Sequence, residues 1–368
     1  MEKIAFMRNS MEILGGAERV CANLCNALCT QYEVHLINQY KNNSAYKLDP
    51  RVKIYFLNKV KKKLRYTIWY DIINLRKYLL KNNISVVVSN GRTSSPILPL
   101  AVMNSKIKII QCEHQSLSDL QYKRKTEKIL NKYIFPGIMN CVVNKVVALT
   151  QQDMKMYGKI YKIPKNRLAS IYNFIDEKLF ESISKYNISS KKIITVGRFD
   201  YAKGYEYLVE VAKRVFEKYP AWQWYIYGEG DQEYKLKIKT LIKDENLESK
   251  VILMGNKDNI YELYNEYSFL VMTSRYEGLP MTLLEAKAKK LPLVSFDIES
   301  GPSEIIRSDI DGFLVQAFDT EEMSCKICNL IENPELRQKF SDNAQGNLDK
   351  FSKEKIMKQW CDLIESVE

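Results

Sequence analysis

Two glutamates, Glu277 and Glu285, stand eight positions apart in the stretch SRYEGLPMTLLEA and enclose Gly-Leu-Pro. Pro280 suits the first position of a helix, because the N–H that proline lacks would have no intrahelical partner there, and residues 281–288 are predicted to form that helix. The first N–H groups of a helix can bind an anion. Two carboxylates beside such a helix start fit a ligand with both phosphate and hydroxyl groups, such as a nucleotide-sugar. An ordinary helix start with two solvated acids is the alternative.

Two cations lie in the stretch GRFDYAKG, residues 197–204, directly after a predicted strand. Arg198 and Lys203 flank this loop, and Gly204 stands at the start of the next helix. Two fixed cations at the edge of a sheet can neutralise a diphosphate, which is the leaving group when a sugar is transferred from a nucleotide. A pair of solvated surface cations is the alternative.

Further candidate residues follow other predicted strands. Gly15 and Gly16 open a helix in GGAER and would let a ligand approach the backbone closely. This is not a G-x-G-x-x-G motif, and no acidic residue is placed to bind a nicotinamide ribose, so a dehydrogenase is disfavoured. His114 comes after Glu113 at another strand end, with a purely structural histidine as the alternative. Two more strand-end residues could face a cleft, although helix capping explains them nearly as well: Asn173 and Glu229.

No metal site is predicted. Asp309 and Asp311 form an Asp-x-Asp pattern like the metal motif of other sugar transferases, but they precede Gly312 and a strand, which is typical of a tight turn. The cysteines fall in helical patterns as small apolar residues, rather than as iron–sulfur or zinc ligands or disulfide partners. The closely spaced ones are Cys21, Cys25, Cys29, Cys325 and Cys328.

The elements that must hold these residues form two series of short apolar runs separated by amphipathic stretches. Such alternation predicts two α/β units with mostly parallel sheets. The polar stretch 181–192 is the expected linker, and residues 352–366 are predicted to form a final amphipathic helix. Ligands of parallel sheets bind at the carboxyl ends of the strands. The expected strands cover residues 3–7, 33–38, 52–57, 84–90, 107–113, 145–150, 191–199, 222–228, 250–255, 269–274, 291–296 and 312–315.

Charge is distributed unevenly along the chain. Residues 1–180 contain 30 Lys and Arg against 12 Asp and Glu, whereas residues 181–368 contain 26 against 32. A first half with a net charge of +18 predicts an anionic partner for that half. Nucleic acid is one candidate, but no helix-turn-helix, RNP or zinc-finger pattern supports it. An anionic membrane surface is preferred, because basic runs stand beside aromatic residues: Lys61, Lys62, Lys63 and Arg65 beside Tyr66, Trp69 and Tyr70, and a second run over residues 122–135.

The compartment follows from the absence of apolar segments. No stretch approaches the 18 or more apolar residues of a membrane span, and the first residues lack the pattern of a signal peptide. The expectation is a cytoplasmic protein held peripherally at the inner face of the cell membrane.

Taken jointly, the motifs resemble glycosyltransferase family 4, whose members have the GT-B fold. The motifs are GGAER, Glu-His after a mid-chain strand, GRF-x3-KG, and Glu-x7-Glu with internal Gly-Leu-Pro, and they span nearly the whole chain. The resemblance implies two Rossmann-like domains facing across a cleft. The expected domains are an acceptor-binding domain over residues 1–180, a nucleotide-sugar-binding domain over 181–350, and a helix over 351–368 that crosses back to the first domain.

The resemblance also implies a role for each candidate residue. Arg198 and Lys203 would bind the diphosphate, Glu285 the ribose and Glu277 the hydroxyl groups of the donor sugar. His114 would contact the sugar near the reacting carbon. Together with Arg198, Lys203 and Glu277 it forms the expected catalytic set. Gly16 would let the N-terminal loop close over the phosphate. Backbone N–H groups would contact the sugar around Gly278, Leu279 and Met281 and the phosphates at Thr282 and Leu283. Pro280 takes a place often held by glycine in the family and removes one such N–H.

The activity implied is transfer of a hexose or N-acetylhexosamine with retention of anomeric configuration, without a metal or other cofactor. The leaving phosphate would help to deprotonate the acceptor hydroxyl in a front-face substitution. The expected donor is a UDP-sugar, with a GDP-sugar less favoured, and the expected acceptor is a lipid-linked saccharide in surface polysaccharide synthesis. A nucleotide-sugar epimerase or a phosphorylase of the same fold is the alternative.

Overall fold

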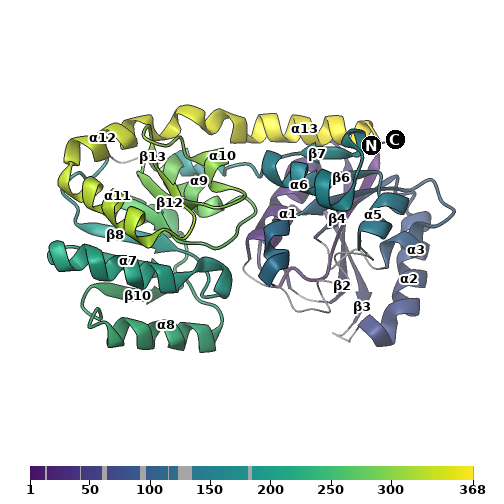
Figure 1. Cartoon of the computed structure of the whole chain (residues 1–368). Coiled ribbons are helices and arrows are strands. Elements are labelled where there is room, and N and C mark those ends of the chain that lie inside the picture. The colour runs from purple at the N-terminus through teal and green to yellow at the C-terminus, as the bar shows by residue number, and fades with distance from the viewer. Residues whose placement is uncertain are drawn as a thin grey trace. The chain divides into compact units, whose positions relative to one another are not determined.

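The structure is a computed structural model, and it describes residues 1–12, 15–41, 43–59, 64–91, 97–114, 116–122, 135–180 and 185–367. The chain forms two compact units (Figure 1): Met1–Asn173 with Glu354–Glu368, and Phe174–Lys353. The chain therefore enters the second unit after Asn173 and leaves it after Lys353, where the sequence had suggested positions 180 and 350. The short 3-10 helix η5 (Glu177–Phe180) contacts helix α9 (Met281–Ala288), which explains why residues 174–180 belong to the second unit.

The first unit contains a parallel sheet of seven strands in the order β3-β2-β1-β4-β5-β6-β7. Its strands are β1 (Lys3–Arg8), β2 (Glu33–Tyr40), β3 (Lys53–Asn58), β4 (Val86–Asn90), β5 (Lys108–Glu113), β6 (Lys145–Ala148) and β7 (Leu168–Ser170). Its helices are α1 (Gly16–Leu28), α2 (Leu64–Lys81), α3 (Leu98–Val102), α5 (Phe135–Val142), α6 (Gln151–Tyr161) and α13 (Lys353–Glu365), with 3-10 turns η2 (Leu117–Tyr122) and η4 (Lys165–Arg167). All six predicted strands of this half are confirmed.

The second unit contains a parallel sheet of six strands in the order β10-β9-β8-β11-β12-β13. Its strands are β8 (Lys192–Val196), β9 (Gln223–Tyr227), β10 (Val251–Gly255), β11 (Phe269–Met272), β12 (Leu293–Asp297) and β13 (Gly312–Gln316). Besides α9, its helices are α7 (Tyr205–Lys218), α8 (Gln232–Asp244), α10 (Pro302–Ile305), α11 (Thr320–Glu332) and α12 (Pro334–Asn343). Its 3-10 helices, besides η5, are η6 (Tyr201–Lys203), η7 (Ile260–Glu262), η8 (Tyr264–Glu266) and η9 (Ala344–Phe351). The predicted α/β fold with two Rossmann-like units is confirmed.

Burial explains why these strands read as apolar runs rather than as alternating patterns. In a parallel sheet covered by helices, both faces of a central strand are buried. In β11 all four residues are buried, and Val271 belongs to a core shared with α7, α8 and α11, which lie beside this sheet in Figure 1. In the first unit β4 is buried over its whole length, and Val87 packs in the core with residues of α2, α3 and α6.

The last helix, α13, belongs to the first unit. Its Ile356 and Trp360 are buried, and Cys361 Sγ donates a hydrogen bond to Gln31 Oε1 at 2.9 Å. Among the helices of the described residues, none is both long enough and apolar enough to span a membrane.

The strand orders determine where the loops of each unit converge. In the second sheet β8 pairs with β9 on one side and with β11 on the other. The chain thus moves outward in opposite directions from the β8/β11 boundary, and ligands of such sheets bind outside the carboxyl ends at this point. The loops after β8 and β11 are the GRFDYAKG and SRYEGLP stretches. The corresponding boundary of the first sheet lies between β1 and β4.

Candidate active site

The cation of one loop meets the carboxylate of the other. Lys203 Nζ lies 2.6 Å from Glu277 Oε1, and the two side chains are only 18% and 14% exposed. Ser274 Oγ donates a second hydrogen bond to the same carboxylate oxygen at 2.7 Å. The structure therefore brings together two residues to which the sequence assigned adjacent parts of one ligand.

Arg275 joins the two loops through its backbone and its side chain. Its N–H donates to Ala202 O at 2.7 Å, and its Nη1 donates to Tyr201 O at 2.7 Å. Nη2 forms an ion pair with Glu206 Oε2 at 3.1 Å, at the start of α7. The guanidinium also lies 4.1 Å from the ring centroid of Tyr201, which adds a cation–π contact. These contacts hold the Lys203 loop against the Glu277 loop.

Two glycines allow the backbones around this pair to approach closely. Gly204 has φ of +60°, and a Cβ at this position would lie 2.4 Å from Thr273 O. Gly301 has φ of +105°, and a Cβ there would lie 2.6 Å from Gly278 O and 2.7 Å from Pro280 Cδ. Only glycine adopts such backbone angles readily and leaves this space. The start of α10 is thus packed directly against the Gly-Leu-Pro turn.

Helix α9 begins where the sequence predicted, at Met281, and ends at Ala288. The sequence placed Pro280 at the first helical position. In the structure Pro280 is instead the N-cap, with φ of −72° and ψ of 96°. The extended ψ keeps proline outside the helix while its carbonyl accepts a hydrogen bond from Leu283 N–H at 3.0 Å. Thr282 lies in the first turn, where N–H groups lack intrahelical acceptors. Glu285 is buried one turn further along.

Arg198, a predicted diphosphate ligand, and Glu229, a candidate to face the donor cleft, make ion pairs with other residues. Arg198 Nη2 lies 3.3 Å from Asp200 Oδ2, and its side chain is 62% exposed. Glu229 forms hydrogen bonds of 2.7 and 2.8 Å with Lys235 Nζ, which lowers the pKa of the Glu229 carboxyl. Both residues lie at the carboxyl ends of neighbouring strands, on the same edge of the sheet as Lys203.

In the first unit, His114 is held by Asn90. Its Nε2 lies 2.9 Å from Asn90 Oδ1. Because an amide oxygen can only accept a hydrogen bond, this contact assigns the ring proton to Nε2. Its Nδ1 is buried and has no hydrogen-bond partner among the described residues. Arg8 lies at the end of β1, donates to Asn90 O at 3.0 Å and pairs with Glu18 Oε1 at 2.5 Å. Burial, followed by the charge of Arg8, lowers the pKa of His114 to about 3.

The glycine pair lies on the same edge of this sheet. Gly15 is the N-cap of α1, and Gly16 is its first residue, with open space where a side chain would stand. Tyr46 donates a hydrogen bond from its hydroxyl to Gly15 O at 3.1 Å. Asn173 is buried and is the last residue before the chain enters the second unit.

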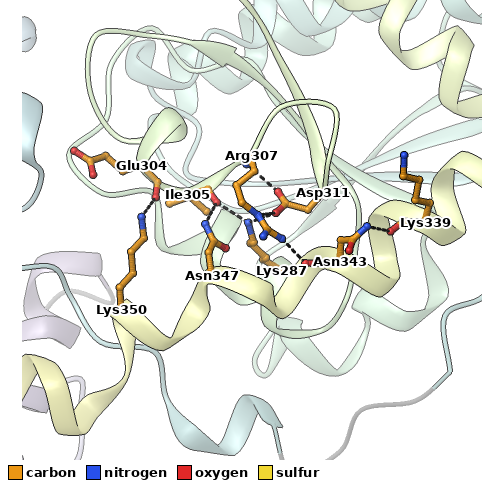
Figure 2. Close-up of polar contacts among 9 residues, drawn as sticks. All are labelled: Lys287, Glu304, Ile305, Arg307, Asp311, Lys339, Asn343, Asn347 and Lys350. Atoms are coloured by element: carbon orange, nitrogen blue, oxygen red, sulfur yellow. Dashed lines mark hydrogen bonds and ion pairs between the residues drawn. The ribbon is translucent and has the colours of Figure 1, made fainter.

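One residue of the Asp-x-Asp pattern, Asp311, belongs to a buried ion-pair network (Figure 2). The other, Asp309, has φ of +64° in the turn before β13. Asp311 is fully buried, and its Oδ2 lies 2.8 Å from Lys287 Nζ and 2.5 Å from Arg307 Nε. Within the described residues, no group of three or more His, Cys, Asp and Glu could hold a metal ion. All eight cysteines are free thiols.

Several residues that the sequence assigned to a membrane surface lie outside what the structure describes: Lys61, Lys62, Lys63, and the side chains of Arg65 and Tyr66. Two of the accompanying aromatics are described. Trp69 and Tyr70 of α2 are 71% and 59% exposed, and Ile73 one turn later is 52% exposed.

Three residues of the site escaped the sequence analysis: Ser274, Arg275 and Gly301. Ser274 and Arg275 lie in the stretch that was singled out, but nothing in the sequence indicates which strand-end loop their side chains contact. Gly301 precedes Pro302 after a predicted strand, and this Gly-Pro pair at a strand-to-helix turn was a usable signal.

Comparison with known proteins identifies the family from both units. Residues 14–179 match the family described as Glycosyltransferase Family 4, and residues 178–347 match the family described as Glycosyl transferases group 1. The chain belongs to glycosyltransferase family 4. It is therefore a glycosyltransferase, as the motifs predicted.

Relatives match this glycosyltransferase from end to end. The amylovoran biosynthesis glycosyltransferase AmsD of Erwinia amylovora is 27% identical, covering 99% of this chain and 100% of its own. A Campylobacter jejuni alpha-1,4-N-acetyl-D-galactosaminyltransferase, whose name includes a PP-undecaprenol-linked GalNAc saccharide, is 27% identical and covers 100% and 99%. HepE of Anabaena, solved with UDP and glucose, has a TM-score of 0.84 at 17% identity, with 100% of each chain covered. That likeness confirms the GT-B fold.

Proposed function

We propose that the chain transfers a hexose or N-acetylhexosamine from a UDP-sugar, with retention of configuration, to a lipid-linked saccharide acceptor in surface polysaccharide synthesis. The observation that carries this proposal is the Lys203–Glu277 pair beside the start of α9. An ammonium group, a carboxylate and unpartnered helix N–H groups then meet at one sheet edge. These are the groups that a sugar diphosphate needs.

Each part of the site has a chemical task in this proposal. Lys203 and Arg198 neutralise the charge that develops on the leaving diphosphate, since cations aimed at developing charge stabilise the transition state. The N–H group of Thr282 binds the same phosphates. The N–H group of Leu283, which was expected there too, already donates to Pro280 O. Glu277 accepts hydrogen bonds from sugar hydroxyls, and Glu285 accepts them from the ribose. The leaving phosphate oxygen takes the proton of the attacking acceptor hydroxyl.

His114 contributes as a neutral ring. Because Asn90 Oδ1 accepts a hydrogen bond from Nε2–H and Nδ1 is buried, the ring adds no positive charge near an electron-poor reacting carbon. Gly16 leaves room for a phosphate at the start of α1.

The acceptor class is supported by the relatives. One is named for amylovoran biosynthesis, and the other carries an undecaprenol-linked saccharide in its name. HepE was solved with UDP and glucose, which supports UDP as the nucleotide. A lipid-linked acceptor also requires the enzyme to work at a membrane surface.

A peripheral position at the inner membrane face is therefore part of the proposal. The first half of the chain carries a net charge of +18, and α2 exposes Trp69 and Tyr70 after the basic stretch 59–65. Lys and Arg near an anionic membrane each contribute about 1 kcal/mol, and interfacial aromatics add to this. The proposal includes no metal and no nucleic-acid partner.

A thermal-shift screen with UDP-sugars and GDP-sugars tests the donor. A ligand at 100 times its Kd stabilises a protein by about 2.7 kcal/mol, which gives a measurable rise in Tm. The protein is then incubated with the nucleotide-sugar that raises its Tm and with undecaprenol-linked saccharides. NMR of the product reports its anomeric configuration. An α-linked product from an α-configured donor is expected. No shift with any nucleotide-sugar, or inversion at the anomeric carbon, would refute the proposal.

A further inference from the structure

A lysine without a task in the proposed chemistry lies buried on the donor helix. Lys287 belongs to α9, two residues after Glu285, and neither its side chain nor that of Asp311 is exposed. Its Nζ lies 2.8 Å from Asp311 Oδ2 (Figure 2). Residues two apart on a helix point to opposite sides, so Lys287 anchors the side of α9 that lies away from Glu285.

The same network binds carbonyl groups at the ends of short helices. The last carbonyls of a helix have no intrahelical donor, and side chains that carry N–H groups can satisfy them. Figure 2 shows four such bonds, from η9, α9 and the turn after α10. They are Lys287 Nζ to Ile305 O at 2.6 Å, Asn347 Nδ2 to Ile305 O at 3.1 Å, Lys350 Nζ to Glu304 O at 2.6 Å, and Arg307 Nη2 to Asn343 O at 2.7 Å.

Helix α10 connects this network to the donor turn. Its C-terminal residue, Ile305, is held by Lys287, and its N-cap, Gly301, packs against Gly278 and Pro280. The helix is only four residues long, so these two ends are roughly 6 Å apart. A shift at Ile305 would therefore be transmitted to the turn that presents Gly278 to the donor.

We propose that Lys287 and Asp311 are positioning residues of the donor site, whose ion pair fixes α10 against the Gly278–Pro280 turn and α9 behind it. This inference rests on the proposed function. It assigns a role in substrate binding to a pair that does not touch the substrate. The pair acts by holding two short helices on either side of the turn.

The charges of this pair need to be removed together. Removing one partner leaves the other buried and uncompensated, whereas replacing both with apolar residues of similar size is often well tolerated. The test variant is therefore Lys287→Met with Asp311→Leu. Arg307 also loses Asp311 in this variant, but its side chain is 33% exposed and keeps its hydrogen bond to Asn343 O. The matched control is Lys213→Gln with Glu245→Gln, which removes an ion pair of 2.6 Å from the exposed surface of the same unit.

Isothermal titration calorimetry measures the UDP affinity of the wild type, the test variant and the control. GDP replaces UDP if the wild type binds GDP more tightly. We expect the test variant to keep a Tm within a few degrees of wild type and to show a nucleotide Kd raised about tenfold or more, with kcat changed less than the donor KM. The control should match wild type. A test variant with wild-type Kd and donor KM would overturn the inference. If the wild type binds no nucleotide, the proposed function fails. If the wild type binds and the test variant binds equally well, only the positioning role fails.

A second measurement serves if the double variant does not fold. Burial lowers the pKa of Lys287 to about 8, although Asp311 opposes this, and the other charges facing it are Arg307 and Lys350. Nucleotide Kd of the wild type should therefore rise at least threefold from pH 7 to pH 9, as Lys287 loses its charge. Lys287→Arg keeps the charge and should flatten this rise. The same rise in wild type and Lys287→Arg, or none in wild type, would contradict the inference.

Discussion

Lys203 Nζ and Glu277 Oε1 lie 2.6 Å apart, although the two residues are 74 positions apart in the sequence. They come from the loops after β8 and β11, which are neighbouring strands of the second sheet. Parallel strands end at the same edge, so any two loops after adjacent strands can combine their side chains there. A sugar diphosphate places negative oxygens beside hydroxyl groups, and this pair offers one partner to each.

Removing Lys203 should impair catalysis strongly. Lys203→Ala is expected to lower kcat by on the order of 10²-fold or more, because the leaving diphosphate loses a fixed cation. Because Lys203 and Glu277 are in contact, the loss in Lys203→Ala with Glu277→Gln should be smaller than the product of the single losses. Initial rates with the preferred donor measure this, and Lys213→Ala, an exposed cation, serves as control. Near-normal turnover of folded Lys203→Ala would contradict the assignment.

Removing Arg198 should lower turnover to a similar extent without changing the stability of the protein. Its side chain is 62% exposed and is held by Asp200 at 3.3 Å, so its removal should leave the Tm unchanged. Arg198→Ala is expected to lower turnover by about 10²-fold, since the cation acts only on the developing charge of the leaving group. Asp200→Asn leaves the cation in place and should retain most of the activity. Full activity of folded Arg198→Ala would remove Arg198 from the catalytic set.

His114 should remain neutral across the working pH range. Burial and the charge of Arg8 lower its pKa to about 3, so the ring carries no charge above about pH 4. A folded-state pKa below the unfolded value of about 6.5 means that this group favours unfolding as pH falls from about 6.5 toward 3. NMR of the imidazole groups should show no titration of His114 between pH 5 and 8, and Arg8→Met should raise its pKa. The chain has only two histidines, and His114→Ala assigns the signals. Titration of wild-type His114 near pH 6.5 would refute this prediction.

Activity should persist in excess EDTA. Asp311 is already bound by Lys287 and Arg307, and Asp309 lies in the turn, so this Asp-x-Asp pattern is engaged in holding the fold. The expected outcome is an unchanged initial rate after dialysis against EDTA. Loss of activity that Mg²⁺ or Mn²⁺ restores would show that the reaction uses a metal.

The first unit should bind anionic vesicles. Co-sedimentation with phosphatidylglycerol vesicles is expected at low salt and should weaken as salt rises, because charges are screened beyond about 8 Å at physiological ionic strength. Replacing Lys61, Lys62, Lys63 and Arg65 with Gln should reduce binding without changing nucleotide affinity. The control replaces four exposed lysines of the second unit with Gln: Lys213, Lys218, Lys239 and Lys243.

Residual binding at high salt should depend on the exposed aromatics, so Trp69→Ala with Tyr70→Ala should remove it. Wild-type protein that stays in the supernatant at low salt would favour a soluble acceptor instead.

The sequence predicted the strands well because buried parallel strands are continuous apolar runs. It missed β7 (Leu168–Ser170), an edge strand of three residues that has no such run. Helix α2 (Leu64–Lys81) has an interrupted apolar period, because its buried Asp71 accepts hydrogen bonds from Thr67 and Asn58.

The site was predictable where it depends on strand ends and unpredictable where it depends on tertiary pairing. The proximity of Lys203 to Glu277 follows from the order of β8 and β11. The contact of Arg275 with Glu206 and that of Lys287 with Asp311 depend on how helices pack on the sheet, and no local pattern reports this. A lysine in the middle of a short helix reads as a solvated side chain until its surroundings are known.

The return of the chain to the first unit has a consequence for biosynthesis. Helix α13 completes a unit whose other residues, Met1–Asn173, were made first, and the 180 residues of Phe174–Lys353 are made in between. At about 5–20 residues per second this delay is roughly 10–40 s. During it the surface that will receive Ile356 and Trp360 lacks its helix, while the later unit can already fold. A ribosome that stops before α13 would release a complete second unit attached to a first unit that lacks this helix.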